Sequence, residues 1–175
     1  MEQKKVYTIT VFSENKMGML GRIATIISRR HINIESLNAS KSSIEGIHRF
    51  TISVILPSEE VRKLVAQINK QVDVLKAFYY NNSEIVYQEV ALYKVPAKAF
   101  ADGDVVENLI RSHNARILSI EPEYIVIEKT GHPTETEQLL EELKEIGLYE
   151  FVRSGRVAIV KPMERLNNYL KSLDQ

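Results

Sequence analysis

The sequence predicts an α+β protein made of two similar units, each with two helices on one face of an antiparallel sheet. Residues 6–80 contain segments with a two-residue apolar period and segments with a helical period, in the order β-α-β-β-α-β. Residues 85–160 repeat this order without repeating the residues, and the polar run Asn81-Asn82-Ser83 separates the two halves. This order is typical of the ferredoxin-like fold.

The first half is predicted to contain strands over 6–12, 34–40, 48–56 and 72–80, with helices beginning near residues 20 and 58. Each helix carries one apolar stripe at the spacing of a single helical face. The stripe residues are Leu20, Ile23, Ala24 and Ile27 in the first helix, and Val61, Leu64, Val65 and Ile68 in the second. We assign residues 1–80 to one domain.

The second half is predicted to start with a strand over 85–95 and a short helix after Asp102-Gly103-Asp104. A hairpin of 116–121 and 124–128 follows, around Pro122-Glu123. The next helix is expected to begin at Thr134, because residues 134–137 have capping-box spacing, and to end at Gly147. Further strand over 148–160, interrupted at Gly155, completes a C-terminal ferredoxin-like domain over 85–162, and a short amphipathic helix is expected over 163–175.

The composition is that of an ordinary globular protein, with 44% hydrophobic and 26% charged residues. Lys plus Arg (23) balances Asp plus Glu (23), so no basic surplus favours nucleic acid or a membrane surface as a partner. The absence of cysteine excludes disulfides and thiolate metal sites, and the four histidines are too scattered to suggest a metal site. No apolar run suggests a signal peptide or a membrane span, so we expect a cytoplasmic protein.

The stretch 14–22 joins the first predicted strand to the first helix. Its Asn15 carries an amide that can donate and accept hydrogen bonds, and Gly18 lets the backbone approach a ligand closely. The first N–H groups of the following helix lack helical partners and attract a carboxylate. This arrangement suits an amino-acid ligand, although the same residues also fit a plain turn into a helix.

Four blocks of residues, taken in order, resemble one protein family. The first block is Asn15-x-x-Gly18-x-Leu20, followed by Ser28-Arg29-Arg30 and Asn33-Ile34-Glu35-Ser36-Leu37. The others are 67–74 (Gln-Ile-Asn-Lys-Gln-Val-Asp-Val), 89–95 (Glu-Val-Ala-Leu-Tyr-Lys-Val) and 153–158 (Arg-Ser-Gly-Arg-Val-Ala). Together they are similar to the small, regulatory subunit of acetohydroxyacid (acetolactate) synthase, which begins with a ligand-binding ACT domain.

The resemblance implies a valine site at the seam where the first domains of two subunits pair into a homodimer. The implied site residues are Asn15, Gly18, Met19 and Leu20 from one subunit, and Asn33 and Ile34 from the other. Lys16 and Met17 depart from the acidic and small residues that are usual in this loop of the family. The size of the pocket, and so the choice among valine, leucine and isoleucine, is therefore left open.

The resemblance also implies that the chain is not an enzyme by itself and holds no cofactor of its own. A separate large, catalytic subunit would carry thiamine diphosphate, Mg²⁺ and FAD. This chain would activate that subunit and convey feedback inhibition by valine in branched-chain amino-acid biosynthesis. Gln67, Lys70 and Asp73 are the candidates for contact with the catalytic subunit.

Two other functions remain compatible with the fold class. An ACT-domain transcription regulator that senses amino acids would need a DNA-binding element, for which the sequence shows neither a recognition helix nor a basic patch. An acylphosphatase-like enzyme would need an arginine in the first loop to hold phosphate. That loop has Lys16 instead, and Arg22 already falls in the predicted helix.

Overall fold

The computed structural model describes residues 3–100 and 105–161. It confirms the predicted fold class, with two antiparallel sheets and interleaved helices. The described residues divide into two compact units. The first unit comprises 3–35, 39–87 and 158–161, and the second comprises 36–38, 88–100 and 105–157. These units differ from the predicted domains in two main places, since 36–38 join the second unit and 158–161 return to the first.

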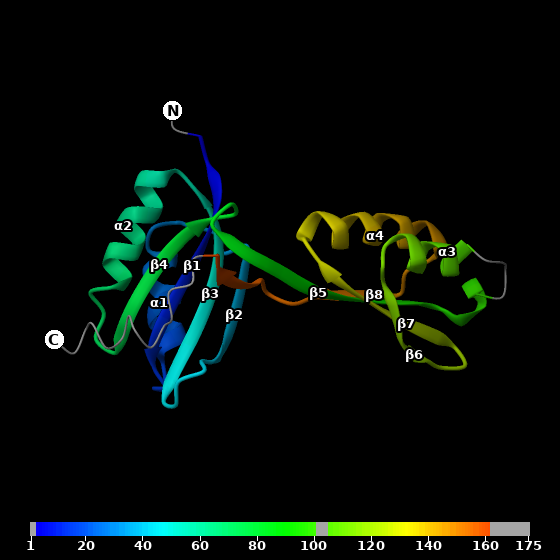
Figure 1. Ribbon diagram of the computed structural model, residues 1–175, viewed down its shortest axis with the longest axis horizontal. Coiled ribbons are helices and arrows are strands. Elements are labelled where there is room, and N and C mark those ends of the chain that lie inside the picture. The colour runs from blue at the N-terminus through cyan, green and yellow to red at the C-terminus, as the bar shows by residue number, and fades with distance from the viewer. Residues whose placement is uncertain (1–2, 101–104, 162–175) are drawn as a thin grey trace. The chain divides into compact units, whose positions relative to one another are not determined.

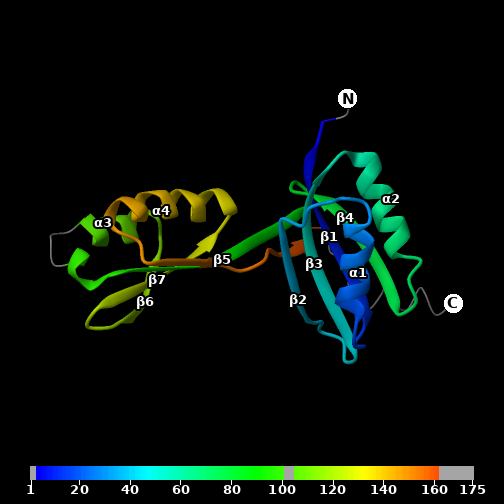
Figure 2. The ribbon, with the colours of Figure 1, turned by 180° about the vertical axis from the view of Figure 1, so that it is seen from behind.

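The first sheet has four strands in the order β2-β3-β1-β4. Its elements along the chain are β1 (Lys5–Glu14), α1 (Met19–Ser28), β2 (Ser36–Lys41), β3 (Ile47–Leu56), α2 (Ser58–Ile68) and β4 (Val74–Asn81). Strand β1 pairs antiparallel with β3 on one side and with β4 on the other. Helices α1 and α2 lie together on one face of this sheet (Figures 1 and 2).

The apolar stripe of α2 is buried as predicted, but the stripe of α1 is rotated from the prediction. All four predicted residues of α2 are buried. In α1 the buried residues are Met19, Ile23, Ile26 and Ile27. Leu20, which was predicted to face the core, is 42% exposed, whereas Met19 is 2% exposed. Both sets of residues fit helical spacing, so the pattern alone did not decide which of the two neighbours points inward.

The second sheet repeats the strand order of the first, as β6-β7-β5-β8, and β9 also pairs with β5. Its elements are β5 (Ile85–Pro96), the 3₁₀ turn η1 (Ala97–Phe100), α3 (Val105–Ser112), β6 (Arg116–Ile120), β7 (Tyr124–Gly131), α4 (Pro133–Ile146), β8 (Glu150–Arg153) and β9 (Val157–Val160). Residues of α3 and α4 pack on β5 and β7 in one core (Figure 1). The predicted turn at 102–104 and the predicted helix over 163–175 lie outside the described residues.

Helix α4 has well-defined ends, but its start differs from the prediction. The helix begins at Pro133, with His132 as the N-cap residue. The N–H of His132 donates to the Glu135 carboxylate over 2.6 Å, which lowers the pKa of Glu135. The capping box predicted at 134–137 was therefore wrong, since proline fits the first helical position and moves the start forward. Gly147 closes the helix as predicted, in a left-handed conformation with φ of 102°.

The described helices include none that is long and apolar enough to cross a membrane.

The second core predicts a large difference between two Leu→Ala substitutions. Leu139 on α4 is fully buried, whereas Leu118 on β6 is 51% exposed. Leu139→Ala should lower the free energy of unfolding by about 2–5 kcal/mol, because it removes transfer energy and leaves a cavity. Leu118→Ala should change it by less than about 1 kcal/mol. Urea denaturation of both variants measures the difference, and equal losses would contradict the position of Leu139 in the core.

Candidate functional site

The loop that links β1 to α1 ends in a left-handed glycine. Gly18 has φ of 83° and is the N-cap residue of α1, with no side-chain hydrogen bond to cap the helix. The first helical hydrogen bond runs from the Arg22 N–H to the Gly18 carbonyl, over 3.0 Å. The first turn of α1 contains no acidic residue, whereas α2 begins with Glu59 and Glu60. The first turn of α1 therefore supplies no acidic side chain of its own to its N-terminal N–H groups, which lack helical partners.

Backbone hydrogen bonds hold this loop between two other turns of the first unit. The Glu14 N–H donates to the Asp73 carbonyl and the Asn15 N–H donates to the Gly46 carbonyl, each over 2.9 Å. The Lys16 N–H donates a hydrogen bond to the Glu14 carbonyl, also over 2.9 Å. The loop is thus anchored to the β2–β3 turn on one side and to the α2–β4 turn on the other.

Asp73 binds cations on both sides of Gly18. Its Oδ1 lies 2.6 Å from Lys16 Nζ, and its Oδ2 lies 3.0 Å from Arg22 Nη1. The hydrogen bond from Lys16 and, to a smaller extent, the one from Arg22 hold the pKa of Asp73 below its usual value. Lys16 also lies 2.7 Å from Glu14. Arg22 thus lies on α1 and is bound to a carboxylate, so the structure gives no support for a phosphate-holding arginine in this loop.

The predicted ligand residues of this loop differ in their accessibility. Asn15 is exposed, and within the described part of the chain its side-chain amide makes no hydrogen bond. Leu20 is 42% exposed, but the side chain of Met19 is buried in the core, so only the backbone of Met19 can meet a ligand. An open hollow of about 560 Å³ lies beside the loop, and of the predicted ligand residues Gly18 lines it but Asn15, Met19 and Leu20 do not. Its lining residues are Met17, Gly18, Gly21, Arg22, Thr25, Ile26, Arg29 and Gln71.

The second predicted group, Asn33 and Ile34, lies just before β2. Asn33 is exposed, and its Nδ2 donates to the Glu35 carboxylate over 3.2 Å. Ile34 is half-buried. Among the described residues, no hydrogen bond joins Asn33 to the loop at 15–18 of the same chain. The pairing of Asn33 of one subunit with the loop at 15–18 of another stays a prediction.

Of the three residues predicted to contact a catalytic subunit, two already have side-chain partners within this chain. The Gln67 side chain accepts a hydrogen bond from Arg30 Nε over 2.7 Å, and Asp73 is bound to Lys16 and Arg22. The Lys70 side chain is exposed, and its ammonium has no partner in the described ranges. Sequence reasoning missed the role of Asp73 in this loop. The sequence contains no local signal for it, because Asp73 is 57 and 51 positions from Lys16 and Arg22.

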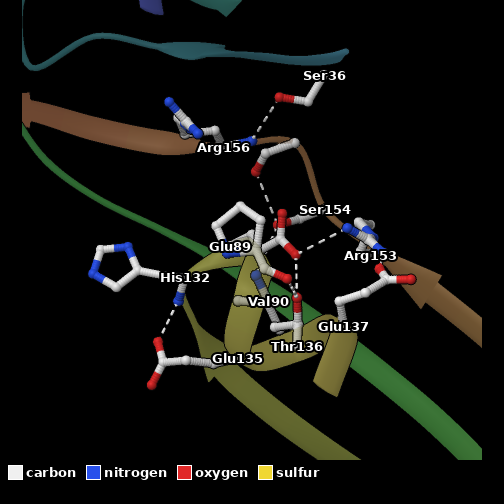
Figure 3. Close-up of polar contacts among 12 residues, drawn as sticks. Ser36, Glu89, Val90, His132, Glu135, Thr136, Glu137, Arg153, Ser154 and Arg156 are labelled. Atoms are coloured by element: carbon white, nitrogen blue, oxygen red, sulfur yellow. Dashed lines mark hydrogen bonds and ion pairs between the residues drawn. The ribbon is translucent and has the colours of Figure 1, made fainter. Parts of the chain in front are cut away.

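A second polar cluster, in the second unit, joins the blocks at 89–95 and 153–158 (Figure 3). Strands β5 and β8 pair so that Ala91 faces Arg153. Glu89 is 4% exposed and accepts a hydrogen bond from Thr136 Oγ1 over 2.5 Å. Arg153 Nη1 lies 3.6 Å from Glu89 Oε1, and the same guanidinium also bonds Glu137. The buried carboxylate is thereby both hydrogen-bonded and paired with a cation, as burial of a charge requires.

Gly155 allows a very close backbone approach beside this cluster. A Cβ atom at Gly155 would lie 2.3 Å from the Leu37 carbonyl oxygen, closer than real Cβ contacts allow. The neighbouring Arg156 N–H donates to Ser36 Oγ over 3.3 Å (Figure 3). Residues 36–38, which begin strand β2, group with the second unit. The contacts of residues 155 and 156 with Leu37 and Ser36 account for this.

In the ranges 3–100 and 105–161, no group of three or more His, Cys, Asp or Glu residues is placed to hold a metal ion.

Comparison with known protein families gives matches to both units. A model of the "AHAS small subunit-like ACT domain" matches residues 9–76. A model of the "Small subunit of acetolactate synthase" matches residues 88–162. The two matches contain the loop at Gly18 and the cluster at Glu89, respectively.

Individual proteins match over most of the chain. The acetolactate synthase small subunit of Bacillus subtilis is 35% identical over 159 residues, which cover 90% of this chain and 91% of that protein. The small subunit from Aquifex aeolicus is 32% identical over 161 residues, covering 92% and 84% of the two chains. The crystal structure of the small subunit from Thermotoga maritima superposes with a TM-score of 0.82 at 25% identity, over 91% of this chain and 99% of that one.

Two Gly→Ala substitutions are predicted to change stability in opposite directions. Gly155→Ala should lower the free energy of unfolding by about 1–3 kcal/mol, because the new Cβ must displace the backbone of Leu37. Gly21→Ala, inside α1 with open space around the new Cβ, should raise it by up to about 1 kcal/mol. Chemical denaturation tests both, and a neutral Gly155→Ala would show that the approach of residues 155 and 37 is not tight.

Proposed function

Because this chain belongs to the family of acetolactate synthase small subunits, we propose that it is the non-catalytic, regulatory partner of a separate catalytic subunit. The observation that carries this proposal is similarity over about nine-tenths of the chain to proteins of that name. In the proposed complex the catalytic subunit holds thiamine diphosphate, Mg²⁺ and FAD, and this chain contributes no cofactor. We expect the complex to act in the cytoplasm, in branched-chain amino-acid biosynthesis.

The loop at Gly18 is the proposed site for valine. Two features of its geometry support this assignment. The N–H groups at the start of α1 offer donors and a positive dipole end to a carboxylate. The exposed amide of Asn15 can bind either charged end of the ligand, and the exposed Leu20 offers an apolar contact.

The proposed site is completed by a second copy of the chain. Asn33 and Ile34 of the partner subunit would add an amide and an apolar side chain, and a homodimer through the ACT domain would bring them to the loop. Valine then inhibits the complex only if it binds one arrangement of the subunits more tightly than another. For contact with the catalytic subunit we propose the 67–73 block, in which the exposed Lys70 is free to bind and Gln67 and Asp73 hold their neighbours.

The regulatory role predicts that mixing the two subunits changes activity. Acetolactate formation should be measured with the cognate catalytic subunit alone, with this chain alone and with both together. This chain alone should be inactive, and its addition should raise the activity of the catalytic subunit. Added valine should then lower that activity. Unchanged activity on mixing would refute the regulatory role.

The valine site predicts a specific loss of affinity in Asn33→Ala. Removing a hydrogen-bonding partner of a charged ligand group costs about 1.5–3 kcal/mol, which is roughly ten- to a hundredfold in Kd. Asn33→Ala should therefore lose most valine binding in calorimetry while still activating the catalytic subunit. Asn108→Ala, which removes an exposed amide from α3, is the matched control and should bind as the wild type does. Wild-type affinity in both Asn15→Ala and Asn33→Ala would place the site elsewhere.

A further inference from the structure

We propose that Asp73 is the positioning residue of the candidate valine site, because its carboxylate joins Lys16 and Arg22 on the two sides of Gly18. This inference rests on the proposed function, but it assigns Asp73 a role inside the ligand loop instead of a contact with the catalytic subunit. The two oxygens of Asp73 each take one cation, at 2.6 Å and 3.0 Å. One side chain thus spans the segment from Lys16 to Arg22.

The position of Asp73 supports a dedicated role. Its backbone is left-handed, with φ of 73°, a conformation that non-glycine residues adopt infrequently and that aspartate and asparagine tolerate best. This turn directs the Asp73 carbonyl to the Glu14 N–H over 2.9 Å. The side chain is only 11% exposed, whereas those of Lys16 and Arg22 are about half exposed. Asp73 is therefore the less accessible centre to which both cations are held.

Beyond the backbone hydrogen bonds of Glu14, Asn15 and Lys16, few contacts of the loop's own side chains fix its shape. Asn15, Met17 and Gly18 are all exposed, and Met17 is 97% exposed. Glycine adds backbone freedom that a ligand would have to remove on binding. Holding Lys16 and Arg22 in place orders both flanks of Gly18 before the ligand arrives, which lowers the entropic cost of binding.

The same contacts balance the charge of the loop. Two cations, Lys16 and Arg22, meet two carboxylates, Glu14 and Asp73, so these four side chains together carry no net charge. A ligand carboxylate would then find Lys16 and Arg22 already paired, so the N–H groups at the start of α1 would be its donors in this loop. Asp73 thereby favours one mode of binding for the ligand.

The test compares Asp73→Asn with Glu59→Gln in the full-length chain. Asparagine keeps the size of the side chain, tolerates the left-handed backbone and preserves the carbonyl that binds Glu14. It removes only the charge that holds Lys16 and Arg22. Glu59→Gln removes a carboxylate from an exposed pair with Arg62, over 2.9 Å, in the same unit and outside the site.

Amide hydrogen exchange without ligand reports on the loop directly. In Asp73→Asn, the hydrogen-bonded amides of Asn15, Lys16 and Arg22 should exchange faster, and in Glu59→Gln they should exchange as in the wild type. In calorimetry the Kd for valine should rise about tenfold in Asp73→Asn and stay unchanged in Glu59→Gln. An Arg22→Gln, Asp73→Asn double variant should bind valine no more weakly than the weaker-binding single variant, because both changes break the same Arg22–Asp73 contact.

Each outcome decides a separate point. Wild-type exchange rates in Asp73→Asn, or faster exchange with an unchanged Kd, would overturn the positioning role. A lower melting temperature alone, with the wild-type Kd, would mark Asp73 as structural only and would overturn it as well. A wild-type chain that binds no valine refutes the proposed valine site and with it the positioning role for valine, and the exchange rates then show only whether Asp73 orders the loop.

Discussion

The antiparallel pairing of β1 with both of its neighbours is the interaction on which the candidate site depends. The pairs at the end of β1 are Glu14 with Ile47 on β3 and Ser13 with Val74 on β4. Each partner strand begins at that point, so the turns before them, at Gly46 and Asp73, must meet the loop that follows β1. The loop is therefore placed by the register of the sheet, and its charges and its glycine determine what it can bind.

The second unit uses the same principle with different chemistry. Strand β5 occupies the position of β1, and its pairing with β8 brings the cluster around Glu89 next to Arg153. In the first unit the paired charges lie near the surface, beside the loop at Gly18. In the second, a buried carboxylate is satisfied by Thr136 and Arg153, so its charge is not left unpaired in the interior. Similar topology thus gives one half an open candidate site and the other a polar cluster around a buried carboxylate.

The elements that the sequence predicted well are those with one consistently buried face. The stripe of α2 and the alternation of β3 follow directly from such burial. The stripe of α1 was wrong at its first residue, because Met19 and Leu20 are adjacent and both apolar and only the packing shows which one points inward. The roles of Asp73 and Gly155 could not be predicted, because their partners are distant in the chain. Asp73 binds residues 57 and 51 positions away, and Gly155 touches Leu37, so only the tertiary structure reveals either contact.

We propose that two copies of the chain form the valine site together, with the loop of one and Asn33 of the other. Sedimentation of the full-length protein at micromolar concentration, with and without valine, tests this most directly. The account predicts a dimer whose dissociation is suppressed by valine, since a ligand that bridges two subunits stabilises their association. A monomer that binds valine and stays monomeric would contradict it.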